Sequence, residues 1–249
     1  MPQTASSTCF LLKFGTVILH QQDGQVVAEH IDILARDNSI VAIAHNIPEP
    51  KDITEVIDCT DSIISLGFVD THRYLWQTQL KGRHSDDLLT DYVPRGYLAG
   101  FFYNVEDVQF GELSGALESI DAGTTTIVDH MHVAYSPEHI EAAKTALVAS
   151  DVRGVFCPTP TVRVKRWSPD LQTEEDQVPF WFMPALKDVP KQRPLANGRI
   201  SLGLGFDSFA VPQEEIEGIF SQCRESSLHL ITSHHFHGQI CEHFFLASI

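Results

Sequence analysis

From residue 62 onward the chain alternates short apolar runs with amphipathic stretches, and this rhythm limits the folds that it can adopt. Stretches with apolar side chains at helical spacing cover residues 105–123, 136–151 and 211–227. Apolar or β-branched runs typical of buried strands lie near residues 63–72, 124–130, 152–157, 200–206 and 228–234. This alternation predicts a parallel sheet with helices packed against it, either open or closed into a barrel.

The length of the chain limits how much of a barrel it can build. A complete eight-fold barrel of strands and helices takes roughly 200 residues or more. Of the 249 residues, 10–60 form short predicted strands joined by turns such as QQDG and ARDN, and 158–198 are Pro-rich and irregular. We therefore predict an α/β fold with an incomplete, C-terminally truncated TIM-like (β/α) barrel of about five strands over 63–249, preceded by an N-terminal β-sandwich unit over 1–62.

The composition of the chain disfavours some classes of binding partner. The formal net charge of −16 disfavours nucleic acid, because binding phosphates needs clustered Lys and Arg. No run of about 18 apolar residues indicates a membrane-spanning helix, and the first residues do not resemble a secretory signal. Five scattered cysteines without a Cys-x-x-Cys pair are typical of reduced thiols. We expect a cytoplasmic protein that binds a small molecule, and neither nucleic acid nor membrane.

Polar side chains gather where the predicted strands end, and the carboxyl ends of parallel strands line the ligand sites of such sheets. Imidazole is a common ligand of catalytic zinc, which takes about three protein ligands and keeps one position open. The spacing is compatible with a metal site, and equally with histidines that only bond the backbone or aspartates that cap turns. The residues concerned are Asp70, His72, Asp129, His130, His132, Asp207, His234, His235 and His237.

The stretch GFVDTHRYLWQT, residues 67–78, places His72 and Tyr74 two positions apart at the end of the first predicted strand. A strand points residues i and i+2 to the same face, so these two side chains should lie side by side. A tyrosine is a poor metal ligand, because its phenol has an ordinary pKa of about 10 and must lose its proton to bind.

Four stretches of the chain resemble the amidohydrolase superfamily, in particular its branch of cytosine deaminases, chlorohydrolases and related fungal enzymes. The resemblance implies a (β/α)₈ barrel with its active site at the carboxyl ends of the strands. It also implies hydrolysis of C–N or C–Cl bonds in a small cyclic or amide substrate, with zinc or iron as cofactor. The four stretches are residues 16–47 with 56–82, GALESIDAGTTTIVDHMHVAYSPEHIEAA, VRGVFCP and LHLITSHH.

Carried over residue by residue, the resemblance places His72 at the first histidine of a metal-binding His-x-His pair and Tyr74 at the second. It places His234 at the metal histidine of a later strand, and His237 where deaminases carry a proton-moving glutamate. The metal ligands implied are therefore His72 and His234, in a site degraded at Tyr74. His237, Tyr74 and His130 are the expected catalytic groups.

Three functions are compatible with the sequence. The first is an amidohydrolase-like enzyme. The second is an inactive truncated homologue or pseudoenzyme that binds a ligand, forms a homo-oligomer or pairs with a full-length homologue. The third is a metal-free enzyme of a small-molecule biosynthetic pathway, in which His72, Tyr74, His130 and His234 act as acid/base groups.

Overall fold

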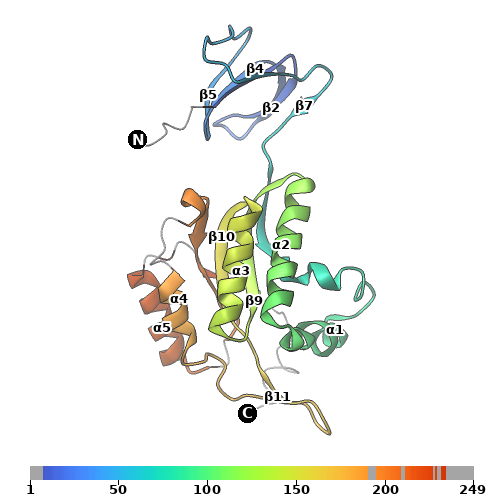
Figure 1. The fold of residues 1–249 in the computed structure, drawn as a ribbon, viewed down its shortest axis with the longest axis vertical. Helices are drawn as coiled ribbons and strands as arrows, with labels where there is room; N and C mark the ends of the chain where they lie inside the picture. The colour runs from blue at the N-terminus through green and yellow to red at the C-terminus, as the bar shows by residue number, and fades with distance from the viewer. Residues whose placement is uncertain (1–7, 190–194, 209–210, 227, 229–230, 234–249) are drawn as a thin grey trace. The chain divides into compact units, whose positions relative to one another are not determined.

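The computed structural model describes residues 8–189, 195–208, 211–226, 228 and 231–233. Within it the chain divides into two compact units, Met1–Gly67 and Phe68–Ile249 (Figure 1). In the described parts of both units, no helix combines the length and apolar character needed to cross a membrane.

Seven short strands build the first unit. They form a four-stranded sheet in the order β5-β4-β1-β6 and a three-stranded sheet in the order β3-β2-β7. The predicted QQDG and ARDN turns join β2 to β3 and β4 to β5, and Gly24 and Asp37 adopt φ angles of 84° and 50° there. The strands are β1 Cys9–Lys13, β2 Thr16–His20, β3 Val26–His30, β4 Asp32–Arg36, β5 Ser39–Ala44, β6 Glu55–Asp58 and β7 Ile63–Ile64.

A parallel sheet with helices packed on it forms the second unit. Its four strands lie in the order β13-β10-β9-β8, and every neighbouring pair is parallel, as predicted. A separate parallel pair joins β14 to β15, and the sheet does not close into a barrel within the described residues. The strands are β8 Phe68–Arg73, β9 Thr124–Ala134, β10 Arg153–Pro160, β13 Ile200–Leu202, β14 Leu204–Gly205 and β15 Ile231–Thr232.

Helices α2 and α3 lie against β9 in Figure 1, and α4 and α5 lie farther along the sheet. The α-helices are α1 Leu89–Tyr92, α2 Val105–Asp121, α3 Pro137–Ser150, α4 Phe182–Asp188 and α5 Gln213–Glu225. Shorter helical turns are η1 Leu75–Leu80, η2 Val93–Tyr97, η3 Leu98–Phe102 and η5 Ala196–Gly198, and a small hairpin pairs β11 Val164–Arg166 with β12 Gln172–Thr173.

Local sequence signals explain where the two central helices begin. The Asn104 side chain accepts a hydrogen bond from Asp107 N at 2.9 Å, and the Asp107 side chain accepts one from Asn104 N at 3.0 Å, which forms a capping box before α2. Ser136 precedes α3 as predicted, with Pro137 in the first turn. The Ser136 hydroxyl, however, contacts His139 Nδ1 rather than a backbone N–H.

Three predictions about the elements are wrong. The single buried strand expected over 63–72 is two strands, because Ile63–Ile64 pair with β2 in the first unit and Phe68–Arg73 pair with β9 in the second. The second of these is the edge strand of its sheet, and the Phe68 side chain is 69% exposed. The strand expected over 200–206 is interrupted at Gly203, and 158–198 is not wholly irregular, because it carries β11, β12 and α4.

Candidate functional site

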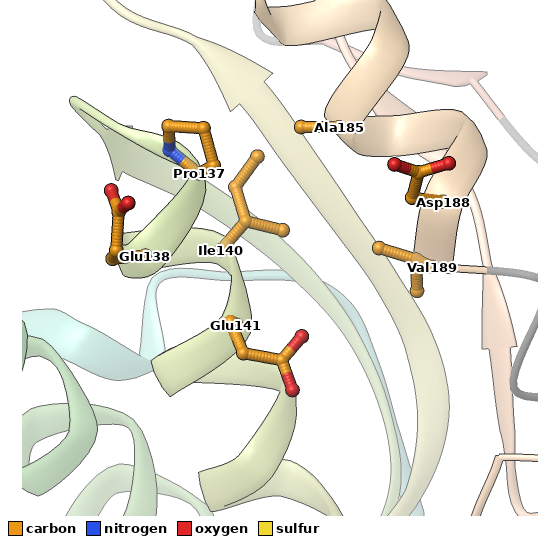
Figure 2. A pocket seen from close by; sticks show the side chains of 7 residues that line it. All are labelled: Pro137, Glu138, Ile140, Glu141, Ala185, Asp188 and Val189. Carbon is orange, nitrogen blue, oxygen red and sulfur yellow. The ribbon is translucent and has the colours of Figure 1, made fainter.

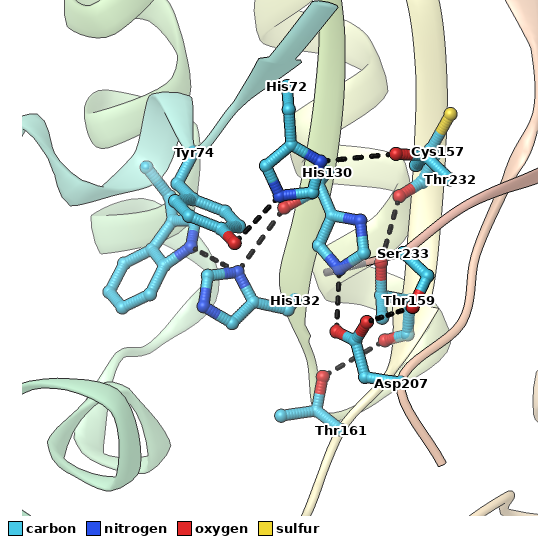
Figure 3. A network of polar contacts seen from close by, with 11 residues as sticks. His72, Tyr74, His130, His132, Cys157, Thr159, Thr161, Asp207, Thr232 and Ser233 are labelled. Atoms are coloured by element: carbon cyan, nitrogen blue, oxygen red, sulfur yellow. Dashed lines mark hydrogen bonds and ion pairs between the residues drawn. The ribbon is translucent and has the colours of Figure 1, made fainter. Parts of the chain in front are cut away.

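Polar side chains from the ends of several strands meet in one cluster, which Figure 3 shows from close by. Two come from β8 and the residue after it, two from β9, and others from β10, from the residues after β14 and from β15. For β8, β9 and β10 this placement follows from the parallel sheet, since its strands end at the same edge. Asp207, Thr232 and Ser233 belong to the separate β14–β15 pair or closely follow its strands. The members are His72, Tyr74, His130, His132, Cys157, Thr159, Asp207, Thr232 and Ser233.

His72 contacts a hydroxyl group with each of its ring nitrogens. Its Nε2 lies 2.7 Å from Tyr74 Oη, and its Nδ1 lies 3.1 Å from Thr232 Oγ1. A neutral imidazole donates through one nitrogen and accepts through the other, which these two hydroxyls can satisfy. Burial, and then the charge of Asp207, raises the pKa of Tyr74 above its ordinary value. The phenol therefore stays protonated at neutral pH and can donate to His72.

His130 forms the second pair of the cluster. Its Nε2 lies 2.7 Å from Asp207 Oδ2, and the imidazole is fully buried whereas the Asp207 side chain is 14% exposed. Ser233 Oγ donates to the other carboxyl oxygen of Asp207 at 3.2 Å. The rings of His130 and His72 have centroids 4.7 Å apart. An aspartate at this distance fixes the orientation of an imidazole ring, an arrangement suited to proton transfer.

Aromatic rings line the side of the cluster next to His132. His132 Nδ1 has two neighbours, Trp76 Nε1 at 3.1 Å and the carbonyl oxygen of His130 at 3.2 Å. An Nδ1 without a proton accepts from the indole, and an Nδ1 that carries one donates to the carbonyl. The Tyr97 ring stacks on His132 at a centroid distance of 5.0 Å, and the Tyr74 ring lies 4.4 Å from it. These rings enclose His132, which is 3% exposed, and make this side of the cluster aromatic.

Two of the three aspartates expected at the site, Asp70 and Asp129, have partners outside the cluster. Asp70 accepts from the backbone N–H of His72 at 3.3 Å and forms an ion pair with Arg73, so both of these partners lie within β8 itself. Asp129 accepts from the backbone N–H of Leu75 and faces Glu112 on α2. Cys157 remains a thiol, because burial raises its pKa.

The described residues do not fit a catalytic zinc. No group of three His, Cys, Asp or Glu side chains within the described ranges is arranged to hold a metal ion. His72 Nε2 contacts a neutral phenol and His130 Nε2 contacts Asp207. The other expected ligand, His234, and the expected catalytic residue His237 lie outside the described residues.

Sequence reasoning brought His72, Tyr74, His130 and Asp207 to one edge of the sheet but missed several of their partners. Thr232 and Ser233 directly precede His234 and His235, two of the histidines expected at the site. Trp76 lies in η1, two residues after Tyr74. Closeness in the chain to a predicted site residue was therefore the signal that could have found all three.

A second hollow lies away from this cluster, between α3 and α4 (Figure 2). It has a volume of about 270 Å³ and includes none of the cluster residues. Its carboxylates include Glu141, which forms an ion pair with Lys144 on its own helix. Its lining is Pro137, Glu138, Ile140, Glu141, Ala185, Asp188 and Val189.

Comparisons with known proteins find relatives for part of the chain. It is 31% identical over 145 residues to 5-methylthioadenosine/S-adenosylhomocysteine deaminase from Thermococcus kodakarensis, a match that covers 58% of this chain and 32% of the deaminase. It is 34% identical over 126 residues to 5'-deoxyadenosine deaminase from Methanobrevibacter smithii, covering 50% of this chain and 27% of that protein. The chain thus spans about a third or less of these relatives. No protein-family profile matches it.

Solved structures extend the similarity of fold to most of the chain. A variant of atrazine chlorohydrolase from Arthrobacter aurescens TC1, complexed with zinc and atraton, superposes with a TM-score of 0.75 at 17% identity, covering 92% of this chain and 53% of that one. Guanine deaminase from C. acetobutylicum with bound guanine gives a TM-score of 0.69 at 17% identity, with coverages of 92% and 52%. The proteins that this chain resembles in sequence and in fold are thus deaminases and chlorohydrolases of the amidohydrolase superfamily.

Proposed function

We propose that this chain is an amidohydrolase-like protein whose ancestral reaction is metal-dependent hydrolysis of a C–N or C–Cl bond, and whose metal site is degraded at Tyr74. The observation that carries the proposal is the contact of 2.7 Å between His72 Nε2 and Tyr74 Oη. A metal ion at His72 would have to displace this phenol or deprotonate it, and burial raises the pKa of the phenol. Similarity to deaminases supports the ancestry.

The chemistry of the cluster favours a small, flat, polar ligand. The aromatic rings packed around His132 favour a flat ring beside them, and the His130–Asp207 pair offers groups that exchange protons. The relatives and structural neighbours are named for adenosine derivatives, guanine and atrazine, all of which carry a nitrogen heterocycle. We propose a nitrogen heterocycle with an exocyclic amino group or halogen as the ligand class.

Restoring the missing imidazole tests this proposal. We expect the Tyr74→His variant to bind Zn²⁺ at least ~10-fold more tightly than the wild-type chain, a difference of about 1.4 kcal/mol, because a neutral imidazole replaces a protonated phenol. The measurement is calorimetric titration with Zn²⁺, with metal content checked by elemental analysis. A Tyr103→His variant, which adds an imidazole outside the cluster, should leave the affinity unchanged.

One result would refute the degraded site outright. If the wild-type chain already holds one equivalent of zinc or iron and loses it on His72→Ala, then Tyr74 does not block metal binding. The ligand class is tested separately by calorimetric titration with adenosine, guanine and a chlorotriazine, where loss of binding in a His132→Ala variant is expected.

The contact between His130 Nε2 and Asp207 Oδ2 favours a second function, an acid/base enzyme that uses no metal. In that case Tyr74→Phe and Asp207→Asn should each lower turnover of a heterocyclic substrate, by roughly 10²-fold or more for a proton-transfer group. Tyr74→His should not restore it. A wild-type chain that binds such ligands without any turnover would instead support the non-catalytic alternative.

A further inference from the structure

Two carboxyl groups are buried behind the cluster, between α2 and the sheet. Glu112 of α2 is 0% exposed and Asp129 of β9 is 1% exposed. Because side chains alternate along a strand, Asp129 points to the face of β9 opposite that of His130. The Asp129 and Glu112 carboxyls lie within hydrogen-bonding reach of each other. Neither carboxyl has a role in the function proposed above.

The two carboxyls have too few donors to be ionised together. Asp129 Oδ1 accepts from Leu75 N at 3.5 Å. Asp129 Oδ2 and both carboxyl oxygens of Glu112 receive no hydrogen bond from any described donor group. A carboxylate only accepts, so two carboxylates here would repel each other, whereas one shared proton makes one carboxyl a donor to the other.

The electrostatic surroundings agree with a bound proton. Burial and the charge of Asp129 raise the pKa of Glu112 well above its ordinary value, and burial raises the pKa of Asp129 to about 7. The nearest titratable group on β10 is Cys157, whose thiol stays neutral. The charged groups of the other flanking elements pair among themselves: Arg73 with Asp70 on β8, and Lys144 with Glu141 on α3.

The same pair lies directly against the backbone that carries Tyr74. Gly111 and Gly115 flank Glu112 on α2 and let the helix approach η1 closely, since a Cβ at Gly115 would lie 2.4 Å from Leu75 O and one at Gly111 2.6 Å from Trp76 O. Leu75, whose N–H donates to Asp129, is the residue after Tyr74. A displacement of Asp129 would therefore shift the Leu75 N–H, and with it the Tyr74 residue to which Leu75 is joined by a peptide bond.

We propose that Glu112 and Asp129 share one proton and act as a positioning pair, which holds the Leu75 backbone and thereby keeps the Tyr74 phenol against His72. This inference rests on the role proposed above for Tyr74. The two carboxyls lie behind the sheet, and the Asp129 side chain points to the face of β9 opposite that of His130. They act only through the backbone and fix where the phenol lies.

The positioning role is tested by long-range ¹H–¹⁵N NMR of the histidine rings in the full chain. In the wild-type chain we expect His72 as the neutral tautomer protonated at Nδ1, with the Nε2 resonance shifted by the phenol. Glu112→Gln and Asp129→Asn keep a donor in the pair and should leave that resonance unchanged, as should the exposed control Glu106→Gln. Asp129→Ala should move it to the position that it has in Tyr74→Phe.

The outcomes separate the two proposals. A wild-type His72 whose Nε2 shows no hydrogen bond overturns the proposed role of Tyr74. A wild-type resonance that is shifted as expected, but stays in place in Asp129→Ala, overturns the positioning pair alone.

Infrared spectroscopy tests the shared proton without a disruptive variant. At neutral pH the wild-type chain and Glu106→Gln should show the carbonyl band of a protonated carboxyl, and Glu112→Gln should lack it. A wild-type chain without that band overturns the shared proton.

Discussion

Each unit of the molecule buries an aspartate, and the two aspartates differ in the donors that surround them. In the first unit, Asp32 is 5% exposed. It accepts from the backbone N–H groups of Phe14 and Ile47 at 3.4 and 3.0 Å and lies 3.7 Å from Lys13 Nζ. In the second unit, Asp129 receives one long backbone hydrogen bond and faces another carboxyl, that of Glu112.

The difference shows that burial alone does not determine whether a carboxyl is an ionised hydrogen-bond acceptor or a group that holds a proton. Three donors, one of them a cation, make Asp32 a structural acceptor that joins the loop at Ile47 to the start of β2. A shortage of donors makes Asp129 a group that must keep or share a proton. The first carboxyl stabilises its unit, and the second links the helix layer to the cluster.

The largest expected effect is on the first unit alone. Asp32→Ala should lower its free energy of unfolding by about 3–5 kcal/mol, because it leaves the N–H groups of Phe14 and Ile47 without their acceptor and removes the ion-pair partner of Lys13, whose Nζ keeps only the Ile47 carbonyl oxygen. All three tryptophans, Trp76, Trp167 and Trp181, lie in the second unit. In urea, the far-UV circular dichroism transition should therefore shift while the tryptophan fluorescence transition stays in place. The exposed control Glu49→Ala should move neither.

The pH dependence of the second unit comes next. A carboxyl with a raised pKa in the folded chain stabilises fully below its unfolded pKa of about 4, and this stabilisation is lost as the pH rises to its folded pKa, about 7 for Asp129. The free energy of unfolding followed by tryptophan fluorescence should fall over this range, by up to roughly 1.4 kcal/mol per pH unit for each proton.

Glu112→Gln should flatten the dependence of the free energy of unfolding on pH. The amide N–H of the glutamine donates to Asp129 at every pH, so the pair no longer needs to bind a proton. The variant should therefore be more stable than the wild-type chain above pH 7, whereas Glu106→Gln on the exposed face of α2 should follow the wild-type curve. If the free energy of unfolding changed equally with pH in the wild-type chain, Glu112→Gln and Glu106→Gln, then the Glu112–Asp129 pair would not bind an extra proton. Asp129 would then not differ from Asp32 in this respect.

The smallest effect is a coupling energy. Tyr74→Phe removes the hydroxyl that contacts His72 and should cost about 1 kcal/mol of stability. In a double-mutant cycle with Asp129→Ala, we expect a coupling of about 0.5–1 kcal/mol, since the two residues act on one segment of backbone. The cycle with Asp32→Ala should be additive. Coupling to Asp32 as large as that to Asp129 would contradict the separation of the two roles.

Much of the fold was predictable because its signals are local. The apolar runs and helical spacings predicted the βα order, and the Ser136–Pro137 start of α3 was read from two adjacent residues. The break between β7 and β8 was not predictable in this way. Ile63 and Phe68 have similar apolar character, and only their different partners, β2 and β9, assign them to separate units.

The candidate site also has features that the sequence predicts and features that only the structure shows. Sequence alone determined that His72, Tyr74, His130 and Asp207 follow predicted strands, and therefore that they share one edge of the sheet. Only the tertiary structure decided that His72 contacts a threonine 160 residues away and that Asp129 turns from the cluster toward a glutamate of α2. The physical reason is that the period of a strand fixes which residues share a face, whereas the packing of helices and distant strands fixes what each face meets.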